Sequence, residues 1–485
     1  MLTRLQIKGF KNLRDVDLHF GPFTCIAGRN GVGKSNLFDA ITFLSDLASM
    51  PLLQAALKVR GTGDRIGGIE NLFARSDATP KQMTLIAEMI VPRTVTDDYD
   101  REATASATFL QYTLVLGFDP KPDSKAGKDS IYIEKEELVA KPSSEAGTLL
   151  HFQPDKAWIK RHVFGPGNRR TPFIETVTLE GKDKEEELAI KLYGDLSKAG
   201  RPSEVPARKS PQTVLSGVNA SSHPTALAAR RELQSWRLLQ LEPSALRAPD
   251  EYRGNARLSA TGGHLPNTLL RIGSRVEVAQ QLSELIPGII SVDLDSDDVR
   301  QQRTLNVTMK NGERYAASSL SDGTLRFLAL AVLASDPLAS GLVCLEEPEN
   351  GIHPQRIPDM LRLVYSLAED IDPDDDLPQA SPTLRQVIIN THSPLVVAEL
   401  PDSDLLMAET LRERRAEWIH FKPLGDTWRA RDLPNTELIS KGELQGYLSG
   451  PPPASAMVPA TPNKRRRVQD HLTLDLFNPP ASRSD

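Results

Sequence analysis

The chain is poor in cysteine, with only Cys25 and Cys344 among 485 residues, each inside an apolar strand-like run. Two buried thiols argue against a disulfide framework or a zinc site and favour a reducing compartment. No apolar run is long enough to cross a bilayer, since stretches such as FLALAVLAS are far below twenty residues. No signal peptide precedes the opening LTRLQIKGFKNL, so we expect a cytoplasmic chain without membrane contact.

The sequence also lacks an excess of positive charge, internal repeats and a sustained heptad pattern. The net charge of −6 argues against a protein coated throughout with nucleic acid, although a local basic face remains possible. Without heptads, a long coiled-coil arm is not expected. The length and the 39% hydrophobic content predict two or three folded units.

What the sequence has is a glycine-rich loop, GRNGVGKS, between an apolar strand at 23–27 and a helical pattern at 36–47. In this context the backbone N–H groups and the helix N-terminus converge on a phosphate. Lys34 is predicted to reach the β and γ phosphates and Ser35 to hold Mg²⁺, so the ligand is ATP or GTP. The flanking pattern argues against a chance glycine turn. The residues predicted to bind nucleotide are Gly28, Arg29, Asn30, Gly31, Val32, Gly33, Lys34, Ser35 and Asn36.

A second motif, GLVCLEEPENGIHP, is an apolar strand at 342–345 that ends in two carboxylates. Beside a triphosphate, such a pair suits one group for the metal and the other for the attacking water. We therefore assign Glu346 to the metal side and Glu347 to the general base or water-orienting role. The alternative is an exposed charge pair at a strand end.

Two further motifs follow the same logic. SSLSDGTLRFLALAVLAS places Ser321 and Gly323 at the start of an apolar helix whose N-terminus could meet a γ-phosphate, although Ser321 alone reads equally as a helix cap. QVIINTHSP is a buried strand ending near His392, which could contact the γ-phosphate or the attacking water. A structural histidine is the alternative.

The order GRNGVGKS, LSDGT, LEEPENGIHP, THSP resembles the ABC-type ATPase head of the RecF, SMC and OLD group, in particular its compact bacterial AAA-family members. LQIKGFKNL, NLFARSD and GGHLPNTLLRI are similar to that group as well, so the resemblance covers residues 1–425. It implies ATP and Mg²⁺ as cofactors and a homodimer or higher homo-oligomer formed through ATP. In such heads Ser321 with Gly323 completes the site of the partner, and hydrolysis reopens the dimer. His353 is then placed near the interface, or else on a surface loop.

Two departures from the group stand out. Glu346 occupies a position where aspartate is usual, which puts the metal role and the turnover rate in question. The glutamine with which such heads sense metal and γ-phosphate has no obvious counterpart in the sequence.

The predicted fold is α/β: a two-lobed ABC-type P-loop ATPase head with a mixed sheet and an inserted antiparallel β-rich region. The units are 1–80 with the nucleotide loop, 81–210 rich in strands, 211–425 with a helical part and the second ATPase lobe, a C-terminal helix at 426–449, and a tail at 450–485. Within them we predict strands at 2–10 and 16–20, a loop at 197–212, helical periodicity at 226–241, a helix then a strand at 276–295, and a hairpin around Asn311 and Gly312.

A nuclease domain of the Toprim type, which OLD proteins carry, finds no support after His392. The acidic stretches at 292–298 and 369–378 are interpreted as solvated turns rather than a second metal site. The basic stretch at 156–170, with Trp158 and Phe164, is a candidate contact for DNA, with a solvated hairpin face as the alternative. Helix residues Arg230, Arg231 and Arg237 are a weaker candidate.

The tail contains KRRRVQDHLTLDLF at 464–477. Its part His471–Phe477 resembles the short motif with which bacterial proteins dock on the replication sliding clamp. Alternating leucines of this kind are typical of docking peptides, so another partner is an alternative, as is chance.

The leading hypothesis is an ATP-hydrolysing head that dimerises on ATP and controls a separately encoded effector, a nuclease of the Toprim type, in anti-phage defence. A RecF-like DNA repair ATPase is the first alternative. A regulatory ATP-binding scaffold with little turnover is the second.

Overall fold

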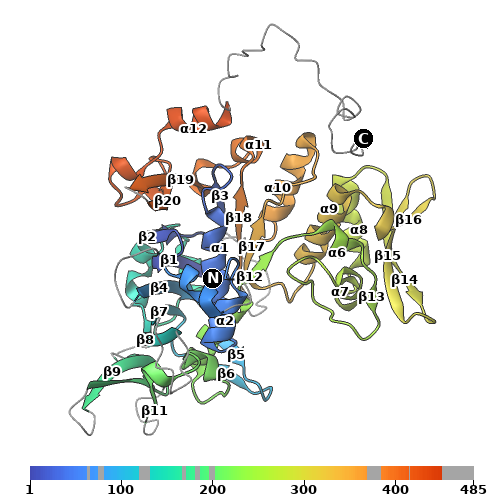
Figure 1. The fold of residues 1–485 in the computed structure, drawn as a ribbon. Helices are drawn as coiled ribbons and strands as arrows, with labels where there is room; N and C mark the ends of the chain where they lie inside the picture. The colour runs from blue at the N-terminus through green and yellow to red at the C-terminus, as the bar shows by residue number, and fades with distance from the viewer. Residues whose placement is uncertain are drawn as a thin grey trace, which may run out of the picture.

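The structure is a computed structural model that describes residues 1–62, 66–74, 81–119, 131–165, 171–180, 186–195, 202–368, 384–413 and 416–449. It is an α/β protein built on three main sheets (Figure 1). The acidic stretch at 369–378 and the tail peptide His471–Phe477 lie outside the described residues. Within the described ranges, no helix combines the length and the apolar composition that a bilayer crossing requires.

An eight-stranded antiparallel sheet has the order β11-β10-β9-β8-β7-β4-β1-β2. Its strands are β1 Leu2–Phe10, β2 Leu13–His19, β4 Lys81–Ile90, β7 Phe109–Phe118, β8 Ile131–Ala140, β9 Ile174–Glu180, β10 Glu186–Leu192 and β11 Ser203–Pro206. The predicted antiparallel β-rich region is thus confirmed, and it continues the sheet that β1 and β2 begin. The loop predicted at 197–212 is wrong in part, because β11 pairs with β10 there.

One large core joins this sheet to the helices that follow the glycine-rich loop. These are α1 Lys34–Leu47 and α2 Leu52–Lys58, together with α5 Pro224–Ser235. Helix α1 buries Lys34 at its start and its apolar residues from Leu37 to Leu47, so the nucleotide loop is anchored to the core.

A six-stranded mixed sheet has the order β12-β17-β18-β3-β19-β20. Its strands are β12 Arg237–Leu239, β17 Gly341–Glu346, β18 Arg385–Thr391, β3 Phe23–Ala27, β19 Leu405–Glu413 and β20 Ala416–Pro423. The first five run parallel and β20 is antiparallel. Strands β3, β17 and β18 are buried almost throughout, as parallel strands covered on both faces must be. Their carboxyl ends share one edge, which brings distant motifs together.

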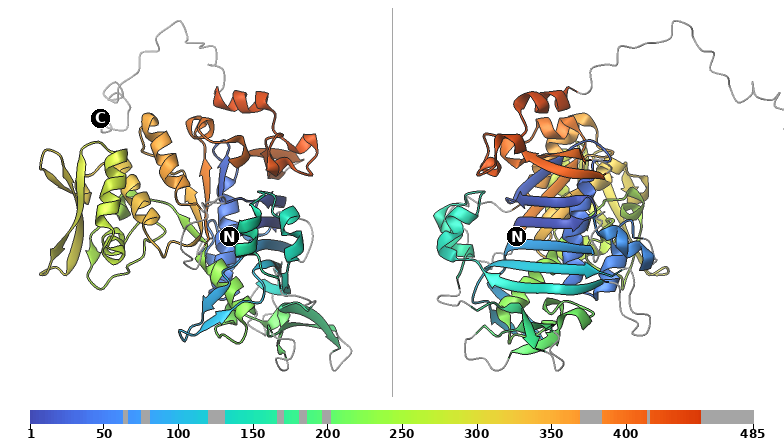
Figure 2. Two further views of the ribbon diagram at one scale, coloured as in Figure 1. Left: turned by 180° about the vertical axis from the view of Figure 1, so that it is seen from behind. Right: turned by 60° about the vertical axis from the view of Figure 1, so that its left-hand side comes forward.

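A smaller lobe carries the third sheet, with β14 and β16 on either side of β15, and β13 beside β15 as well. Its strands are β13 Asp250–Glu251, β14 Ile289–Asp297, β15 Gln302–Met309 and β16 Arg314–Ala316, and its helices are α6 Pro243–Arg247, α7 Leu265–Ile272, α8 Arg275–Leu285 and α9 Asp322–Ala334. The predicted hairpin is confirmed, with Gly312 at φ 82° in its turn. Figures 1 and 2 show this lobe on the opposite side of the mixed sheet from the eight-stranded sheet.

Several predicted elements differ from the structure. The helical pattern at 226–241 ends at Ser235, and residues 237–239 form strand β12 instead. The acidic stretch at 292–298, interpreted as a turn, lies mostly in strand β14. The helix predicted over 426–449 is limited to α12 Lys441–Leu448.

The remaining elements connect these layers. They are α3 Ala146–Leu149, α4 Lys156–His162, α10 Ile357–Tyr365, α11 Pro394–Ala398, the strand pair β5 Thr94–Thr96 and β6 Glu102–Thr104, and short 3₁₀ turns at Ile66–Leu72, Ser143–Glu145, Ala207–Lys209, Leu215–Gly217, Ala317–Ser319, Pro354–Arg356, Asp402–Asp404, Trp428–Ala430 and Asn435–Glu437.

Candidate nucleotide site

The glycine-rich loop joins β3 to α1, as predicted, and two of its glycines are sterically required. At Gly33, φ is 107°, and an added Cβ atom would lie 2.2 Å from the Asn12 side-chain nitrogen. At Gly28, the same atom would lie 2.6 Å from the carbonyl oxygen of Ala408. Any side chain here would therefore push the loop away from its supports.

Lys34 is the first residue of α1 and is 6% exposed. Its ammonium donates to the carbonyl oxygens of Gly28 at 2.7 Å and Arg29 at 3.0 Å. Burial lowers the pKa of Lys34, which the negative charges of Glu347 and Glu349 partly offset. The loop thus holds a cation at its centre with its own carbonyl groups.

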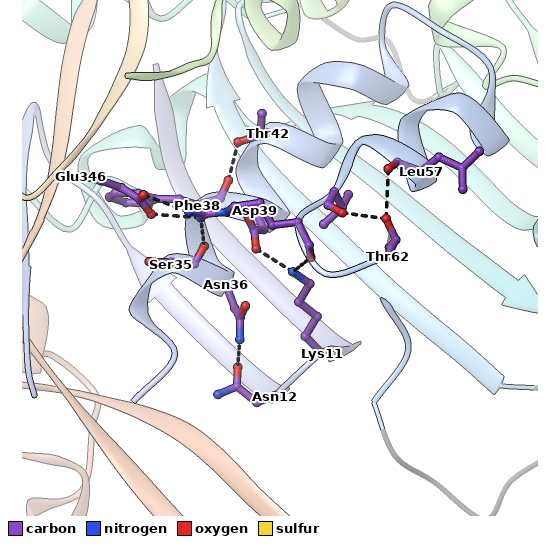
Figure 3. Close-up of polar contacts among 12 residues, drawn as sticks. Lys11, Asn12, Ser35, Asn36, Phe38, Asp39, Thr42, Leu57, Thr62 and Glu346 are labelled. Carbon is purple, nitrogen blue, oxygen red and sulfur yellow. Dashed lines mark hydrogen bonds and ion pairs between the residues drawn. The ribbon is translucent and has the colours of Figure 1, made fainter. Parts of the chain in front are cut away.

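Two asparagines fix the loop from outside. Asn12, in the turn between β1 and β2, donates to the carbonyl of Val32 at 3.1 Å, and Asn36 donates to the Asn12 side chain at 2.7 Å. Figure 3 shows this pair beside Lys11, whose ammonium lies 2.6 Å from Asp39 on α1. The opening hairpin of the chain therefore positions the nucleotide loop.

Glu346 ends β17 and faces Ser35 (Figure 3), and its role on the metal side stays a prediction. Burial raises the pKa of Glu346, but hydrogen bonds from Arg60, Gln240 and Ser35 outweigh it and leave the pKa below its ordinary value. These hydrogen bonds therefore keep the Glu346 carboxylate ionised although it is largely buried.

Gln240 is a site residue that the sequence reading missed. It directly follows β12, which lies parallel to β17, and its side-chain amide donates to Glu346. Because the helix was extended through residue 241, the strand that delivers this glutamine was not seen. Gln240 is therefore a candidate for the glutamine with which ATPase heads of this group sense metal and γ-phosphate.

Arg60 is the second residue that was missed. Its guanidinium donates to both oxygens of Glu346, at 2.9 and 3.0 Å, and its Nε lies 2.7 Å from Asp39. One Nη atom also donates to the carbonyl of Ser35 at 3.1 Å. Arg60 therefore links the end of β17 to the first turns of α1.

Glu347 follows with a left-handed backbone, φ 45°, which is unusual outside glycine. Its backbone N–H lies 3.1 Å from the carbonyl oxygen and 3.0 Å from the side-chain oxygen of Asn390. Its carboxylate lies 2.9 Å from Nδ1 of His392 and accepts from Asn350 at 2.6 Å. The structure thus brings the two predicted catalytic residues, Glu347 and His392, into direct contact.

Glu349 completes the acidic turn but points inward. The side chain accepts a hydrogen bond from the hydroxyl of Thr391, and the residue is 7% exposed. Burial raises the pKa of Glu349 above its ordinary value. This contact joins the turn after β17 to the end of β18, and thereby holds Glu347 and His392 together.

These residues surround a cleft of about 600 Å³. It is lined by Asn30, Gly31, Gly33, Lys34, Ser35, Gln240, Leu241, Glu242, Arg326, Glu346, Glu347, Asn350 and Asn390. A neighbouring cleft of about 1080 Å³ shares Ser35 with it and is bounded by Lys11, Asn12, Asn36, Asp39 and Arg60, among others.

Ser321 and Gly323 do not line either cleft. Ser321 is exposed and caps α9 by accepting from the backbone N–H of Thr324 at 3.2 Å, as the cap reading predicted. An added Cβ on Gly323 would lie 3.0 Å from the carbonyl of Gly351. The tip of α9 thus packs beside the acidic turn and outside the cleft, whereas Arg326, further along the same helix, lines the cleft.

The residues proposed for DNA contact differ in their availability. Trp158 lies in α4 and is only 1% exposed, so the stacking role predicted for it is wrong. Arg93 lies over the ring of Phe164, with 3.9 Å from the guanidinium carbon to the ring centre. Arg230 and Arg231 are tied to Asp98 by ion pairs. Among the described residues, no group of three or more His, Cys, Asp or Glu side chains is placed to hold a metal ion.

A buried strand, a glycine-rich turn with Lys34 and Ser35, and an acidic pair at the end of a parallel strand define a P-loop nucleotide-binding protein. The chain belongs to the family described as "AAA domain, putative AbiEii toxin, Type IV TA system", whose profile matches residues 131–398. The profile "RecF/RecN/SMC N terminal domain" matches residues 1–58. The predicted relation to the RecF, SMC and OLD group of ATPase heads is confirmed.

Known relatives match in part. The chain is 54% identical to an OLD nuclease of Thermus scotoductus over 41 residues, 8% of each chain, and 34% identical to RecF of Bacteroides fragilis over 84 residues, 17% of this chain and 22% of the relative. It thus spans less than a quarter of either protein. A DNA replication and repair protein RecF of Anaeromyxobacter dehalogenans is 25% identical over 293 residues, 56% of this chain and 73% of the relative.

Among solved structures, an SMC head bound to the C-winged helix domain of ScpA aligns with a TM-score of 0.45 and 13% identity, over 87% of this chain and 98% of that one. The SMC head domain from Thermotoga maritima aligns with a TM-score of 0.34 and 12% identity, over 87% and 98% of the two chains.

Proposed function

We propose that this chain is an ATP hydrolase whose site is completed by a second copy. The observation that supports this is the asymmetry of the cleft. Lys34 and Glu347 line it, and so does Arg326 of α9, but Ser321 and Gly323 at the tip of α9 lie outside it. A capped helix N-terminus that is exposed offers free N–H groups and a positive dipole end to another molecule.

The phosphate side of the site is supplied by the loop. Lys34 exchanges its bonds to the carbonyls of Gly28 and Arg29 for the β and γ phosphates, which restores full charge pairing to a buried ammonium. The second cleft, beside Asn12 and Asn36, has room for the ribose and base.

The donor set fits Mg²⁺, since hard cations prefer carboxylate, hydroxyl and amide oxygens. Ser35, Glu346 and Gln240, which line the cleft, would supply these oxygens to the ion. When bound, the ion neutralises charge on the phosphates. Arg60 keeps the Glu346 carboxylate ionised and in place, and must yield part of its bidentate contact when that carboxylate takes another partner.

Glu347 has the role of positioning and deprotonating water. Its left-handed backbone, fixed by Asn390, aims the carboxylate into the cleft, where one oxygen already faces Nδ1 of His392. A proton taken by Glu347 can therefore be shared with His392, while Asn350 holds the second oxygen.

Ser321 and Gly323 act in trans. If they meet the γ-phosphate held by the partner, ATP binds the dimer more tightly than the monomer, and by linkage ATP favours the dimer. Hydrolysis of ATP removes the contact with the γ-phosphate, and the dimer then reopens.

We further propose that the dimer controls a separately encoded effector in defence against phage, with a Toprim-type nuclease as the candidate. The toxin-antitoxin wording of the matching family supports this, as does the short, 54% identical match to an OLD nuclease. Contact with DNA would use the exposed Lys156, Lys160 and Arg161 of α4 rather than its buried tryptophan.

A RecF-like role in DNA repair is the second candidate, because the RecF of Anaeromyxobacter dehalogenans aligns over 73% of its length. A scaffold with little turnover is the third, because Glu346 replaces the usual aspartate and is held by Arg60. Co-purification with the proteins encoded beside its gene, followed by nuclease assays with ATP and DNA, separates the first two.

The site is tested by Glu347→Gln, which keeps the shape and the backbone bonds to Asn390. We expect ATP binding to persist, turnover to fall roughly 10²–10⁴-fold, and an ATP-bound dimer to accumulate in size-exclusion chromatography. Glu399→Gln makes the same chemical change at an exposed position and should match the wild type. Wild-type turnover in Glu347→Gln would rule out the proposed base, and a very low wild-type rate would favour the scaffold.

A further inference from the structure

The small lobe carries a groove that no part of the described chain fills. It lies between α8 and the outer edge of β14 and has a volume of about 350 Å³. Within the described residues β14 pairs only with β15, so its other edge has no strand partner. Figure 1 shows α8 and β14 in this lobe, away from the nucleotide loop at the tip of β3.

The walls of the groove are apolar at one end. Val276 on α8 is 77% exposed and Ile290 on β14 is 57% exposed, while Ala279 and Val292 form a buried floor between them. Both exposed side chains line the groove, so this end presents an apolar surface to solvent.

The other end of β14 is acidic. Asp295, Asp297 and Asp298 are exposed, and Asp295 has no ion pair among the described contacts. An edge strand without a covering element is a ready template for an added strand, and main-chain hydrogen bonds then supply affinity while side-chain pockets supply specificity.

The C-terminal segment 464–477 has the complementary pattern. It begins with KRRR and continues to Leu472, Leu474 and Leu476, which alternate as in a strand. In an antiparallel arrangement its basic end faces the acidic end of β14 and its leucines face the apolar end. Pairing Leu474 with Ile290, which lies at the irregularity in β14, places Arg467 opposite Asp297.

We propose that segment 464–477 docks in this groove as an antiparallel strand added to β14. The connection from Ser449 to Lys464 is 15 residues and extends to about 50 Å at most, on the order of the diameter of a chain of this size. A connection of this length keeps the effective concentration of the segment near the millimolar range at sites within its reach, in its own chain or in a second copy.

The groove is separate from the nucleotide cleft, so this proposal stands or falls independently of the ATPase assignment. It differs from the sliding-clamp reading, in which the same leucines leave the chain to bind another protein. When segment 464–477 is docked in the groove, its three leucines are not available to other partners.

The test uses disulfide formation in the full chain, whose two natural cysteines are buried. Ile290→Cys with Leu474→Cys should form a disulfide at least tenfold faster than Leu338→Cys with Leu474→Cys, since Leu338 is also exposed, at 47%, but lies outside the groove. A crosslinked monomer on a non-reducing gel indicates docking within one chain, and a crosslinked dimer indicates exchange between chains. Equal rates for the two pairs would overturn the proposal.

A charge exchange provides the second measurement. Asp295→Lys with Asp298→Lys should slow the Ile290–Leu474 crosslink several-fold, and adding Arg466→Glu with Arg467→Glu should restore it. Salt should slow the wild-type crosslink in the same direction. A rate that none of these changes alters would show that charge complementarity does not guide the segment, and the antiparallel arrangement would be wrong.

Discussion

The proposal that each site is shared between two chains makes a quantitative prediction for mixed variants. Lys34→Ala removes the buried ammonium from the cleft, so a chain with this change cannot hold phosphate in its own loop. Ser321→Arg blocks the exposed start of α9, so such a chain cannot complete the site of its partner. Each variant alone should therefore be close to inactive.

A mixture of the two behaves differently if the site is composite. In a symmetric dimer each interface contributes two equivalent sites. At equal concentrations half of the dimers are mixed, and one of the two sites in a mixed dimer combines an intact Lys34 with an intact Ser321. The mixture should thus recover up to about a quarter of the wild-type ATPase rate.

The assay is phosphate release after mixing, with the rate compared at several total concentrations. Ser321→Arg also removes a helix cap, which costs about 1 kcal/mol of the free energy of unfolding. Asp155→Ala removes the cap of α4 far from the cleft and serves as the control, with an unchanged ATPase rate. If the mixture is no faster than the mean of the two separate variants although mixed dimers form, Ser321 acts within its own chain or not at all.

Two further changes test the supports of the cleft. Arg60→Gln should lower the free energy of unfolding at pH 7 by about 1 kcal/mol, a modest value because the arginine side chain is 41% exposed. Arg60 lowers the folded-state pKa of Glu346, so this loss of stability is present above the ordinary pKa of 4.5 and disappears as the pH falls through the lower folded-state pKa. Urea unfolding at pH 7 and at a pH below the folded-state pKa measures the difference, and Lys58→Gln, which breaks an exposed ion pair, is the control. A loss that does not depend on pH would contradict the prediction. Gly33→Ala should abolish nucleotide binding in a fluorescence assay and reduce thermal stability, because the new methyl group meets Asn12; normal binding would show that the loop tolerates a side chain there.

The parts of the fold that could be predicted are those written in local sequence. The strand at 23–27 and the carboxylates after 345 were placed correctly because buried parallel strands are short apolar runs with polar residues at their ends. The contact between Glu347 and His392 was not predicted; in the structure it arises because the parallel strands β17 and β18 deliver their carboxyl ends to one edge. The antiparallel region was visible through its alternation.

Gln240 and Arg60 could not be found in this way. Strand β12 has only three residues and continues the apolar spacing of helix α5, so its identity depends on pairing with β17, about a hundred positions away. Arg60 lies in an irregular turn after α2, and only the folded chain shows that its guanidinium reaches Glu346. Long-range pairing of this kind leaves no local signal.

Composition was misleading at two other places. The stretch at 292–298 is acidic, which favoured a turn, but its first residues alternate between apolar and acidic as an edge strand does. Trp158 lies among basic residues, which favoured a surface role, but the ring fills a core with Phe109 and Phe152. Charge in the neighbourhood of a residue does not report which way its side chain points.

The three carboxylates at the end of β17 and in the turn after it have different surroundings. Glu346 still lies in the strand and is kept ionised by its hydrogen-bond donors, which suits a cation ligand. Glu349 is buried against Thr391 with a raised pKa, which suits a structural tie rather than charge. Between them, the left-handed backbone of Glu347 turns its carboxylate toward His392 and the open cleft. Because Glu347 adopts φ 45°, three carboxylates within four residues face three environments, and Glu346 and Glu347 line the cleft whereas Glu349 does not.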